Sequence, residues 1–177
     1  MHPIDLGQAV RPDDMTPGRT RELVACWAAV ADAGGAVGFA FPPVRIGEVE
    51  AAAEEMIAGL DPEYSRLVLA ATGGRLVGWL HVGRHRDPLV RHWGTVRRVQ
   101  SHPEARGLGV GTALMDGVRQ IARDEMGMEQ LHLGARGGEG LEEFYGRLGW
   151  REIGRHPGAL RFAHGDRDEV FMLLRPL

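Results

Sequence analysis

The segment from Ser101 to Met115, SHPEARGLGVGTALM, constrains the fold of this chain more than any other. Its glycines occupy alternate positions, 107, 109 and 111. The residues after them repeat with a 3.6-residue period, which predicts a helix over 109–127. The apolar stripe of that helix consists of Val110, Ala113, Leu114, Val118, Ile121 and Ala122. Strand-like runs lie on each side, over 92–101 and 129–135, so this β-α-β unit predicts two parallel strands.

The remaining segments extend this unit into a larger sheet. Further strands are expected over 4–10, over 65–85 as a hairpin turning at Gly73-Gly74, and over 150–156 and 168–175, joined through 157–167. Further helices are expected over 17–33, 44–59 and 140–149. Three successive strands favour an antiparallel region. We therefore predict an α/β (α+β) fold with a mixed, mostly antiparallel sheet of about seven strands flanked by helices, in a single domain spanning 1–177.

Composition and charge exclude several classes of protein. The net charge of -3 argues against binding to nucleic acid or to anionic membranes. No segment approaches the roughly 20 apolar residues of a membrane helix, and the N-terminus lacks a signal-peptide run. The lone Cys26 excludes an internal disulfide and, within LVACWAAV, is expected in the core. These features predict a soluble, cytoplasmic protein.

The glycine segment has the composition of a phosphate-binding loop. Glycines permit positive φ and close approach of a ligand, and a helix N-terminus favours anions. The segment does not fit a dinucleotide-binding motif, whose glycines stand at offsets 0, 2 and 5, nor a Walker loop, because it contains no lysine. The alternative is a plain glycine-rich turn.

Two motifs resemble one known family. The run Arg106-Gly-Leu-Gly-Val-Gly111 resembles the acyl-CoA-binding motif Arg/Gln-x-x-Gly-x-Gly/Ala of the GCN5-related N-acetyltransferases (GNAT). The run LEEFYGRLGWREIG resembles the last helix and following strand of that family. The segments GGAVGFAF and GLEEFYGRLGW, and the region after HPGAL, are also similar to the tabtoxin-resistance-type acetyltransferases within it.

The resemblance implies a reaction and a co-substrate. It implies transfer of an acetyl group from acetyl-CoA to a primary amine, of a small molecule, by direct attack in a ternary complex. An acyl-CoA-binding or regulatory module without catalysis is the alternative, and the sequence is compatible with a monomer or a homodimer. The implied coenzyme-binding residues are Val99, Gln100, Ser101, Arg106, Gly107, Leu108, Gly109, Val110, Gly111, Thr112 and Arg147. Arg147 could equally be a solvated surface residue.

Tyr145 is the catalytic residue that the resemblance implies. The family uses the tyrosine of this helix to protonate the departing thiolate. Helical spacing allows a second interpretation, because Leu141, Phe144, Tyr145 and Leu148 share one face and Tyr145 could simply belong to the core.

The sequence leaves the general base and the acceptor open. The strand over 92–101 contains no carboxylate, and the remaining candidates are His81, His92, His132, Glu139 and Glu142. His81 and His85 are about 13 Å apart on a strand, which is too far for shared ligation, so no metal is expected. Phe39 and Phe41 either contact the acceptor or pack in the core. An antibiotic, a polyamine, an amino acid and a protein N-terminus all remain candidate acceptors.

Overall fold

A seven-stranded sheet forms the centre of the molecule. The structure, a computed structural model, describes residues 3–35, 37–39 and 41–177, and within them the strands run in the order β1-β2-β3-β4-β5-β7-β6. Their bounds are β1 (Asp5–Ala9), β2 (Ser65–Thr72), β3 (Arg75–Arg84), β4 (Trp93–Ser101), β5 (Gln130–Arg136), β6 (Arg151–Phe162) and β7 (Gly165–Leu174). Only β4 and β5 pair in parallel, while all other neighbours are antiparallel. The predicted mixed, mostly antiparallel sheet is confirmed.

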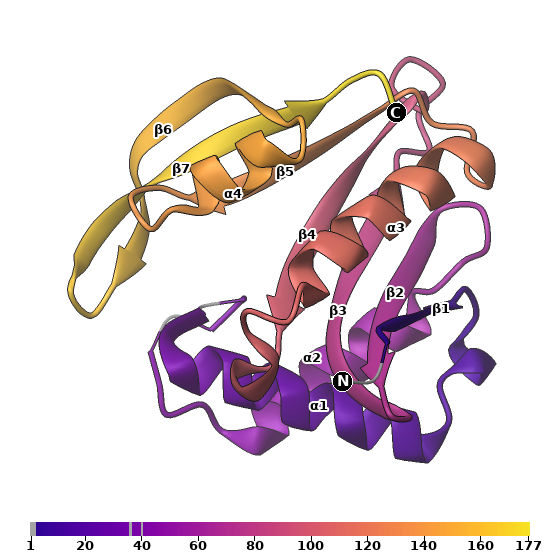
Figure 1. The fold of residues 1–177 in the computed structure, drawn as a ribbon, viewed down its shortest axis with the longest axis vertical. Helices are drawn as coiled ribbons and strands as arrows, with labels where there is room; N and C mark the ends of the chain where they lie inside the picture. Colours follow the sequence, from indigo (N-terminus) through magenta and orange to yellow (C-terminus); the bar gives the residue numbers. More distant parts are fainter. Residues whose placement is uncertain (1–2, 36, 40) are drawn as a thin grey trace.

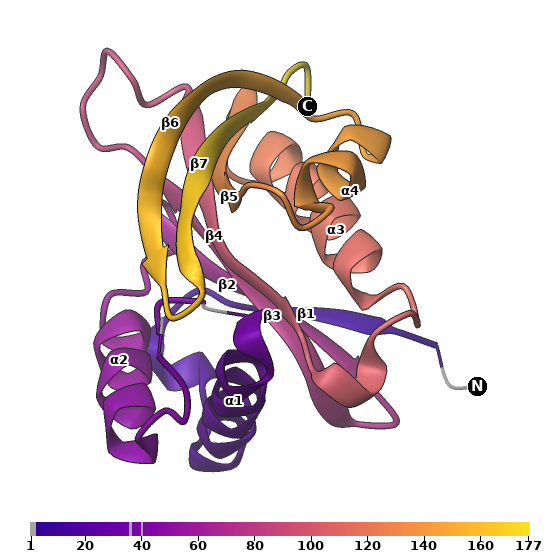
Figure 2. The same ribbon diagram turned by 90° about the vertical axis from the view of Figure 1, so that its left-hand side faces the viewer.

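Helices cover both faces of this sheet (Figures 1 and 2). The bounds are α1 (Pro17–Val30), α2 (Ile46–Ala58), α3 (Val110–Asp124) and α4 (Leu141–Arg147). Helices α1 and α2 lie on one face, and α3 and α4 lie on the other. Alternation along β2 serves both sides, because Leu67 packs in the cluster under α1 and α2 while Val68 packs in the cluster under α3. The core therefore has two layers, one on each side of the sheet.

Helix α1 begins and ends with local signals that the sequence contains. The Thr16 hydroxyl accepts a hydrogen bond from the Arg19 N–H at 3.2 Å, and Pro17 occupies the first helical position. Residues Ala31–Gly35 continue as a π-helical segment, which Gly34 interrupts with a φ of +83°. Cys26 is buried, as expected. Regular helix thus ends three residues before the predicted position 33.

The parallel pair β4–β5 separates soon after it forms. Pairing extends only over Trp93–Thr95 of β4 and Gln130–His132 of β5. Beyond Thr95 the two strands diverge, as Figure 1 shows. A bulge marks the same stretch, because three steps along β4, from Arg97 to Gln100, oppose two steps along β3, and Arg98 there has a φ of +54°. The second half of β4 therefore has no strand partner on its β5 side.

The C-terminal hairpin is longer than the sequence predicts. Residues 157–167 were expected to form a connection, but β6 continues to Phe162 and β7 begins at Gly165. Pro157 and Gly158 indicated a break, yet they lie where the register shifts between His156 and Leu160 on β6, which is an edge strand. A proline on an edge removes no ladder hydrogen bond that the sheet needs. The hairpin continues past the end of β5 (Figure 2).

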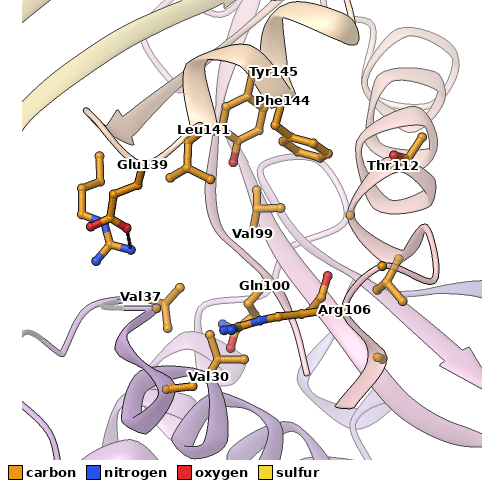
Figure 3. A pocket seen from close by; sticks show the side chains of 18 of the residues that line it. Val30, Val37, Val99, Gln100, Arg106, Thr112, Glu139, Leu141, Phe144 and Tyr145 are labelled. Atoms are coloured by element: carbon orange, nitrogen blue, oxygen red, sulfur yellow. Dashed lines mark ion pairs between the residues drawn. The ribbon is translucent and has the colours of Figure 1, made fainter. Parts of the chain in front are cut away.

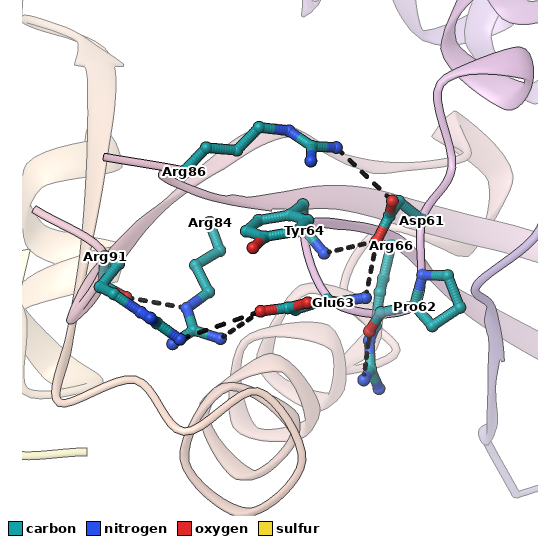
Figure 4. A network of polar contacts seen from close by, with 8 residues as sticks. All are labelled: Asp61, Pro62, Glu63, Tyr64, Arg66, Arg84, Arg86 and Arg91. Carbon is teal, nitrogen blue, oxygen red and sulfur yellow. Dashed lines mark hydrogen bonds and ion pairs between the residues drawn. The ribbon is translucent and has the colours of Figure 1, made fainter. Parts of the chain in front are cut away.

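A polar network fixes the turn between α2 and β2 (Figure 4). The Asp61 carboxylate accepts from the N–H groups of Glu63 and Tyr64 at 2.9 and 3.1 Å, and these bonds hold the pKa of Asp61 below its ordinary value. Arg86 pairs with Asp61 at 3.5 Å and stacks on the Tyr64 ring. Since Arg84, at the end of β3, pairs with Gly94 near the start of β4, this network lies at the end of the sheet away from Ser101.

Candidate active site

One cavity, here called the glycine-loop cavity, collects nearly all of the predicted site residues (Figure 3). Its volume is about 680 Å³. The predicted residues that line it are Val99, Gln100, Ser101, Arg106, Gly107, Gly109, Val110, Gly111, Thr112, Tyr145 and Arg147. Leu108 is not among the lining residues, and its side chain is 49% exposed. The end of β4, the start of α3 and helix α4 thus meet around one space.

The three glycines of the loop have different structural roles. Gly107 and Gly109 have φ values of +78° and +84°, and a Cβ on either would meet no atom within 4 Å. These two positions need glycine for the backbone conformation. A Cβ on Gly111 would lie 3.2 Å from the Phe144 ring, so this position needs glycine because α4 approaches closely.

The N-terminus of α3 is a free donor surface within the described chain. Gly109 is the N-cap residue and supplies no side-chain cap to the first-turn N–H groups. Val110, Gly111 and Thr112 of that turn line the cavity. The positive end of the helix dipole adds to these donors, so the site favours an anion.

Two guanidinium groups beside this donor surface are uncompensated. Arg106 and Arg147 both line the cavity, and among the described residues neither has a carboxylate within ion-pair distance. Arg106 extends across the cavity in Figure 3. Unpaired guanidinium groups next to free N–H donors complement a di-anionic group such as a pyrophosphate.

Tyr145 combines the two roles that the sequence left open. Its ring is buried and packs against Phe144 and Trp150, with ring centroids 5.1 and 6.1 Å away. Its hydroxyl points into the cavity on the side of Val99 (Figure 3). Burial raises the pKa of Tyr145 to about 12, which keeps the hydroxyl protonated at neutral pH. The ring therefore belongs to the core while the hydroxyl is available as a proton donor.

A second cavity, here called the splay cavity, lies between the diverging ends of β4 and β5. Its volume is about 440 Å³, and residues of β4, β5, the 35–39 segment and the β6–β7 hairpin line it. Val99, Leu141 and Tyr145 line both this cavity and the glycine-loop cavity. The two spaces therefore meet beside the Tyr145 side chain.

Charged groups in the splay cavity are unevenly paired. Arg136 pairs with Glu139 at 2.6 Å, and Arg161 pairs with Asp166 at 2.9 Å. Arg97 and Arg98 have no ion pair within the described chain. Burial, and then the charge of Arg97, lowers the pKa of Arg98.

Most of the residues considered as general base lie outside both cavities. The His81 ring is 2.8 Å from the Ser65 hydroxyl, and burial lowers its pKa to about 4. His132 stacks on Trp93 at 4.3 Å, and burial also lowers its pKa. His92 is exposed. None of these three lines either cavity.

The two glutamate candidates also fail to supply a free carboxylate. Glu142 pairs with Arg155 at 3.5 Å and accepts from the Gly138 N–H at 3.2 Å, away from both cavities. Glu139 lines the glycine-loop cavity, but its carboxylate pairs with Arg136.

Glu169 is a site residue that the sequence did not indicate. It is the one carboxylate lining the splay cavity among residues 3–35, 37–39 and 41–177. It lies on β7 opposite Arg136, the last residue of the antiparallel neighbour β5. The sequence pattern did not single out Glu169. A carboxylate next to a buried strand residue such as Val170 is typical of a side chain that faces solvent.

Of the two phenylalanines expected near an acceptor, only Phe39 lines the splay cavity, although both line a neighbouring space. Phe39 lines the splay cavity and packs edge-on against Trp27, with ring centroids 5.5 Å apart. Phe41 is 62% exposed and lines the neighbouring space with Phe39 and Phe162. Ala36 and Ala40 of the same segment lie outside the described residues.

The part of the chain that the structure describes lacks two features, a metal-binding cluster and a membrane-spanning helix. It contains no cluster of three histidine, cysteine or acidic side chains placed to hold a metal ion. None of its helices is both long and apolar enough to cross a bilayer.

Comparison with known proteins identifies the fold and the family. The model of the acetyltransferase (GNAT) family matches residues 38–150. A GNAT-family acetyltransferase from Streptococcus pneumoniae is 16% identical with a TM-score of 0.73, covering 99% of this chain and 100% of that one. A ribosomal-protein-alanine N-acetyltransferase from Brucella melitensis is 19% identical with a TM-score of 0.72, covering 97% and 99%.

A third solved structure has a higher sequence identity over a shorter region. Nourseothricin acetyltransferase is 27% identical with a TM-score of 0.56, covering 66% of this chain and 68% of that one. The family generally uses acetyl-CoA as its acetyl donor. Since the family model matches well over half of the sequence and the fold agrees along its whole length, this chain belongs to the acetyltransferase (GNAT) family and is an acyltransferase.

Proposed function

We propose that this chain transfers the acetyl group of acetyl-CoA to a primary amine of a small molecule within one ternary complex. The observation that carries the proposal is the meeting of two cavities beside Tyr145. One cavity offers hydrogen-bond donors to an anion. The other adjoins it at Val99, which lines both cavities. A donor bound in the first and an amine bound in the second would react where they meet, without moving between sites.

The glycine-loop cavity fits the coenzyme by the chemistry of its donors. The first-turn N–H groups of α3 would hold the pyrophosphate, with Arg106 and Arg147 as counter-charges. The N–H of Leu108 contributes less, because it donates to the Ala105 carbonyl at 3.3 Å. Val99, Gln100 and Ser101 would contact the acyl end, because they occupy the part of β4 that has left β5.

The chain's own groups would then serve each step of the transfer. Acetyl-CoA supplies a thioester whose carbonyl carbon the neutral amine attacks, forming the C–N bond as the C–S bond breaks. A free N–H on the unpaired edge of β4 would stabilise the negative charge that develops on the carbonyl oxygen. The Tyr145 hydroxyl would give its proton to the departing sulfur. The ammonium loses one proton to a base in the splay cavity or to water before the attack, and the second proton that the nitrogen loses as the amide forms passes by the same route and restores the Tyr145 hydroxyl.

A covalent acyl-enzyme is disfavoured by the position of the thiol. Cys26 is 2% exposed and lines neither cavity. Burial raises the pKa of its thiol to about 12, so it is not a ready nucleophile. Direct transfer from donor to acceptor is therefore the favoured route.

The size of the splay cavity supports a small acceptor. A volume of about 440 Å³ lies within the range of pockets that hold small molecules. The β6–β7 hairpin and the 35–39 segment both contribute to its walls. The similarity to nourseothricin acetyltransferase, whose name denotes a small-molecule acceptor, agrees with this assignment.

Release of free thiol from acetyl-CoA tests the proposal. The protein should release thiol when supplied with members of a panel of primary amines, and CoA should raise its unfolding temperature by mass action. NADH or ATP should protect it less. Tight CoA binding without turnover of any amine would instead support an acyl-CoA-binding module, and better protection by ATP would contradict the assignment of the glycine-loop cavity.

A further inference from the structure

Arg98 lines the splay cavity without an ion-pair partner among the described residues, while the charge of Glu55 acts on it from beyond ion-pair distance. Its backbone adopts a φ of +54° at the β4 bulge, a conformation that is uncommon for residues other than glycine. Its guanidinium lies over the Trp27 ring at 4.9 Å and its Nη1 is 3.7 Å from the Met56 sulfur. A partly buried guanidinium normally has a carboxylate partner, and within the described chain this one has none.

Arg97 adds a second unpaired cation at the same place. It neighbours Arg98 on β4 and also lines the splay cavity. The two other arginines of this cavity, Arg136 and Arg161, are already paired with carboxylates. The local excess of positive charge therefore belongs to the β4 side, where it comes from two adjacent residues in the segment that pairs with β3 but has no partner on its β5 side.

Glu169 provides the opposite charge on the β7 side. It lines the splay cavity together with Arg97 and Arg98, and it forms an ion pair with neither. Its side chain lies against Gly134 of β5, where a Cβ would be 2.5 Å from the glutamate Oε1. Glycine at this position thus leaves the space that the carboxylate occupies.

This arrangement complements a molecule that carries both charges. Resting on the proposed function, we propose that the acceptor is a small zwitterion, an amine that also bears a carboxylate or phosphonate group, with its anionic group bound by Arg98 and Arg97 and its amine positioned by Glu169. A planar guanidinium can bind either anion through two hydrogen bonds. A carboxylate beside the amine favours its approach as an ammonium and then accepts its hydrogen bond.

Matched acceptors test the proposal directly. Amino acids, the corresponding amines without the carboxylate, the corresponding amino-acid amides, and aminoalkyl phosphonates are compared in the thiol-release assay. The kcat/KM should be at least about tenfold higher for the amino acids or the phosphonates than for their counterparts without the anionic group, and the better of these two classes identifies the anion. A preference for the amines that lack an anionic group would overturn the proposal while leaving the proposed function intact. Turnover of no amine at all would overturn both.

Variants separate the two ends of the acceptor. Arg98→Gln should raise the KM for the acceptor with an anionic group about 10- to 100-fold. The KM for acetyl-CoA should stay within about twofold, and so should the kcat/KM for the amine that lacks the anionic group. Glu169→Gln should lower kcat/KM to a similar extent for both acceptors, because Glu169 is assigned to the amine and both acceptors carry an amine. An equal loss for both acceptors in Arg98→Gln would overturn the assignment of the anion site.

Two further variants control for charge and for folding. Arg123→Gln makes the same change in net charge at an exposed position that pairs with Asp124, and it should alter neither acceptor's KM. If Arg98→Gln fails to fold because the stacking of Arg98 on Trp27 is lost, Arg97→Gln replaces it in the test. Arg97 is exposed, and its substitution leaves that stacking in place. It should raise the KM for the anionic acceptor severalfold, and no change in that KM would overturn the proposal.

Discussion

The glycine-loop cavity and the splay cavity share Tyr145 but are assembled differently. Most of the polar groups of the first come from one run of residues, 99–112, and they are largely backbone N–H groups at a helix N-terminus. The second gathers side chains from β4, β5, the 35–39 segment and the β6–β7 hairpin. A local backbone conformation is set by its own residues, whereas a set of distant side chains depends on strand register.

This difference explains how one fold can keep its donor and change its acceptor. Substitutions at Arg97, Arg98 or Glu169 alter the charges of the splay cavity without touching the glycine-loop cavity, which these three residues do not line. Loss of a loop glycine alters the backbone itself. Variants in the glycine-loop cavity should therefore change the affinity for CoA, and variants in the splay cavity should change the KM for the acceptor. Tyr145, which lines both cavities, is the exception, because its variant should change kcat.

The largest effect is expected at Tyr145, where the two cavities meet. Tyr145→Phe keeps the ring and its packing but removes the hydroxyl, so catalysis should fall about 10- to 1000-fold. The affinity for CoA should stay nearly unchanged. The measurement is kcat at saturating acetyl-CoA, with calorimetry of CoA binding as the control. Turnover within about twofold of wild type across neutral and alkaline pH would exclude the acid role, and equally weakened CoA binding would indicate a displaced coenzyme.

His81 lies outside both cavities, so a variant at this position should change stability and leave turnover unchanged. Its pKa is about 4 in the folded protein and about 6.5 in the unfolded chain. Between these values only the unfolded chain binds the proton, so the free energy of unfolding should fall as pH drops from about 6.5 to 4, by up to about 3 kcal/mol. Below about pH 4 the contribution of His81 no longer changes.

Urea titrations of wild type and His81→Asn over this pH range provide the check. The variant should lose much of the pH dependence and keep its turnover at about pH 8, because a neutral histidine away from both cavities takes no part in transfer. A variant with wild-type pH dependence would contradict the buried neutral state, and an inactive but folded variant would return His81 to the list of bases.

On the coenzyme side, Gly109→Val should weaken CoA binding at least about tenfold, or about 1.4 kcal/mol. The reason is backbone strain at a φ of +84° rather than collision, because a Cβ there meets no atom within 4 Å. Gly127→Val is a matched control, since Gly127 also has positive φ and open space but lies at the far end of α3. It should cost comparable stability and leave CoA affinity unchanged. Equal loss of affinity in both variants would mean that stability alone explains the effect.

The smallest effect is expected within the loop itself, at Leu108. Its side chain is exposed and lines neither cavity. Leu108→Ala should therefore change the dissociation constant of CoA by less than about twofold, measured by calorimetry. A tenfold change would show that the loop binds through side chains as well as through its backbone, which would weaken the contrast between the two cavities.

The sequence predicted the parts of the molecule that depend on local patterns. The strand order along the chain, the parallel β4–β5 pair and the start of α1 at Thr16 all follow from periodicity and capping. The length of the β6–β7 hairpin did not, because Pro157 and Gly158 act as breakers inside a sheet but are tolerated at a bulge on an edge.

The candidate site divides along the same line. The loop glycines and Tyr145 were predicted from two short motifs, and the structure brings them together. Glu169 and the unpaired state of Arg98 were not, because they depend on which strand faces which and on the distance between Arg98 and the carboxylates of the described residues. Tertiary register decides both, and a single sequence does not reveal it.

Direct transfer between the two cavities is the central claim, and two-substrate initial-rate kinetics test it most directly. Acetyl-CoA is varied at several fixed concentrations of an active amine, and reciprocal rates are plotted against reciprocal concentration of acetyl-CoA. Lines that intersect are predicted, because both substrates must occupy their cavities before the C–N bond forms. Parallel lines, together with an acetylated protein detected by mass spectrometry in the absence of amine, would show a covalent intermediate and contradict the account.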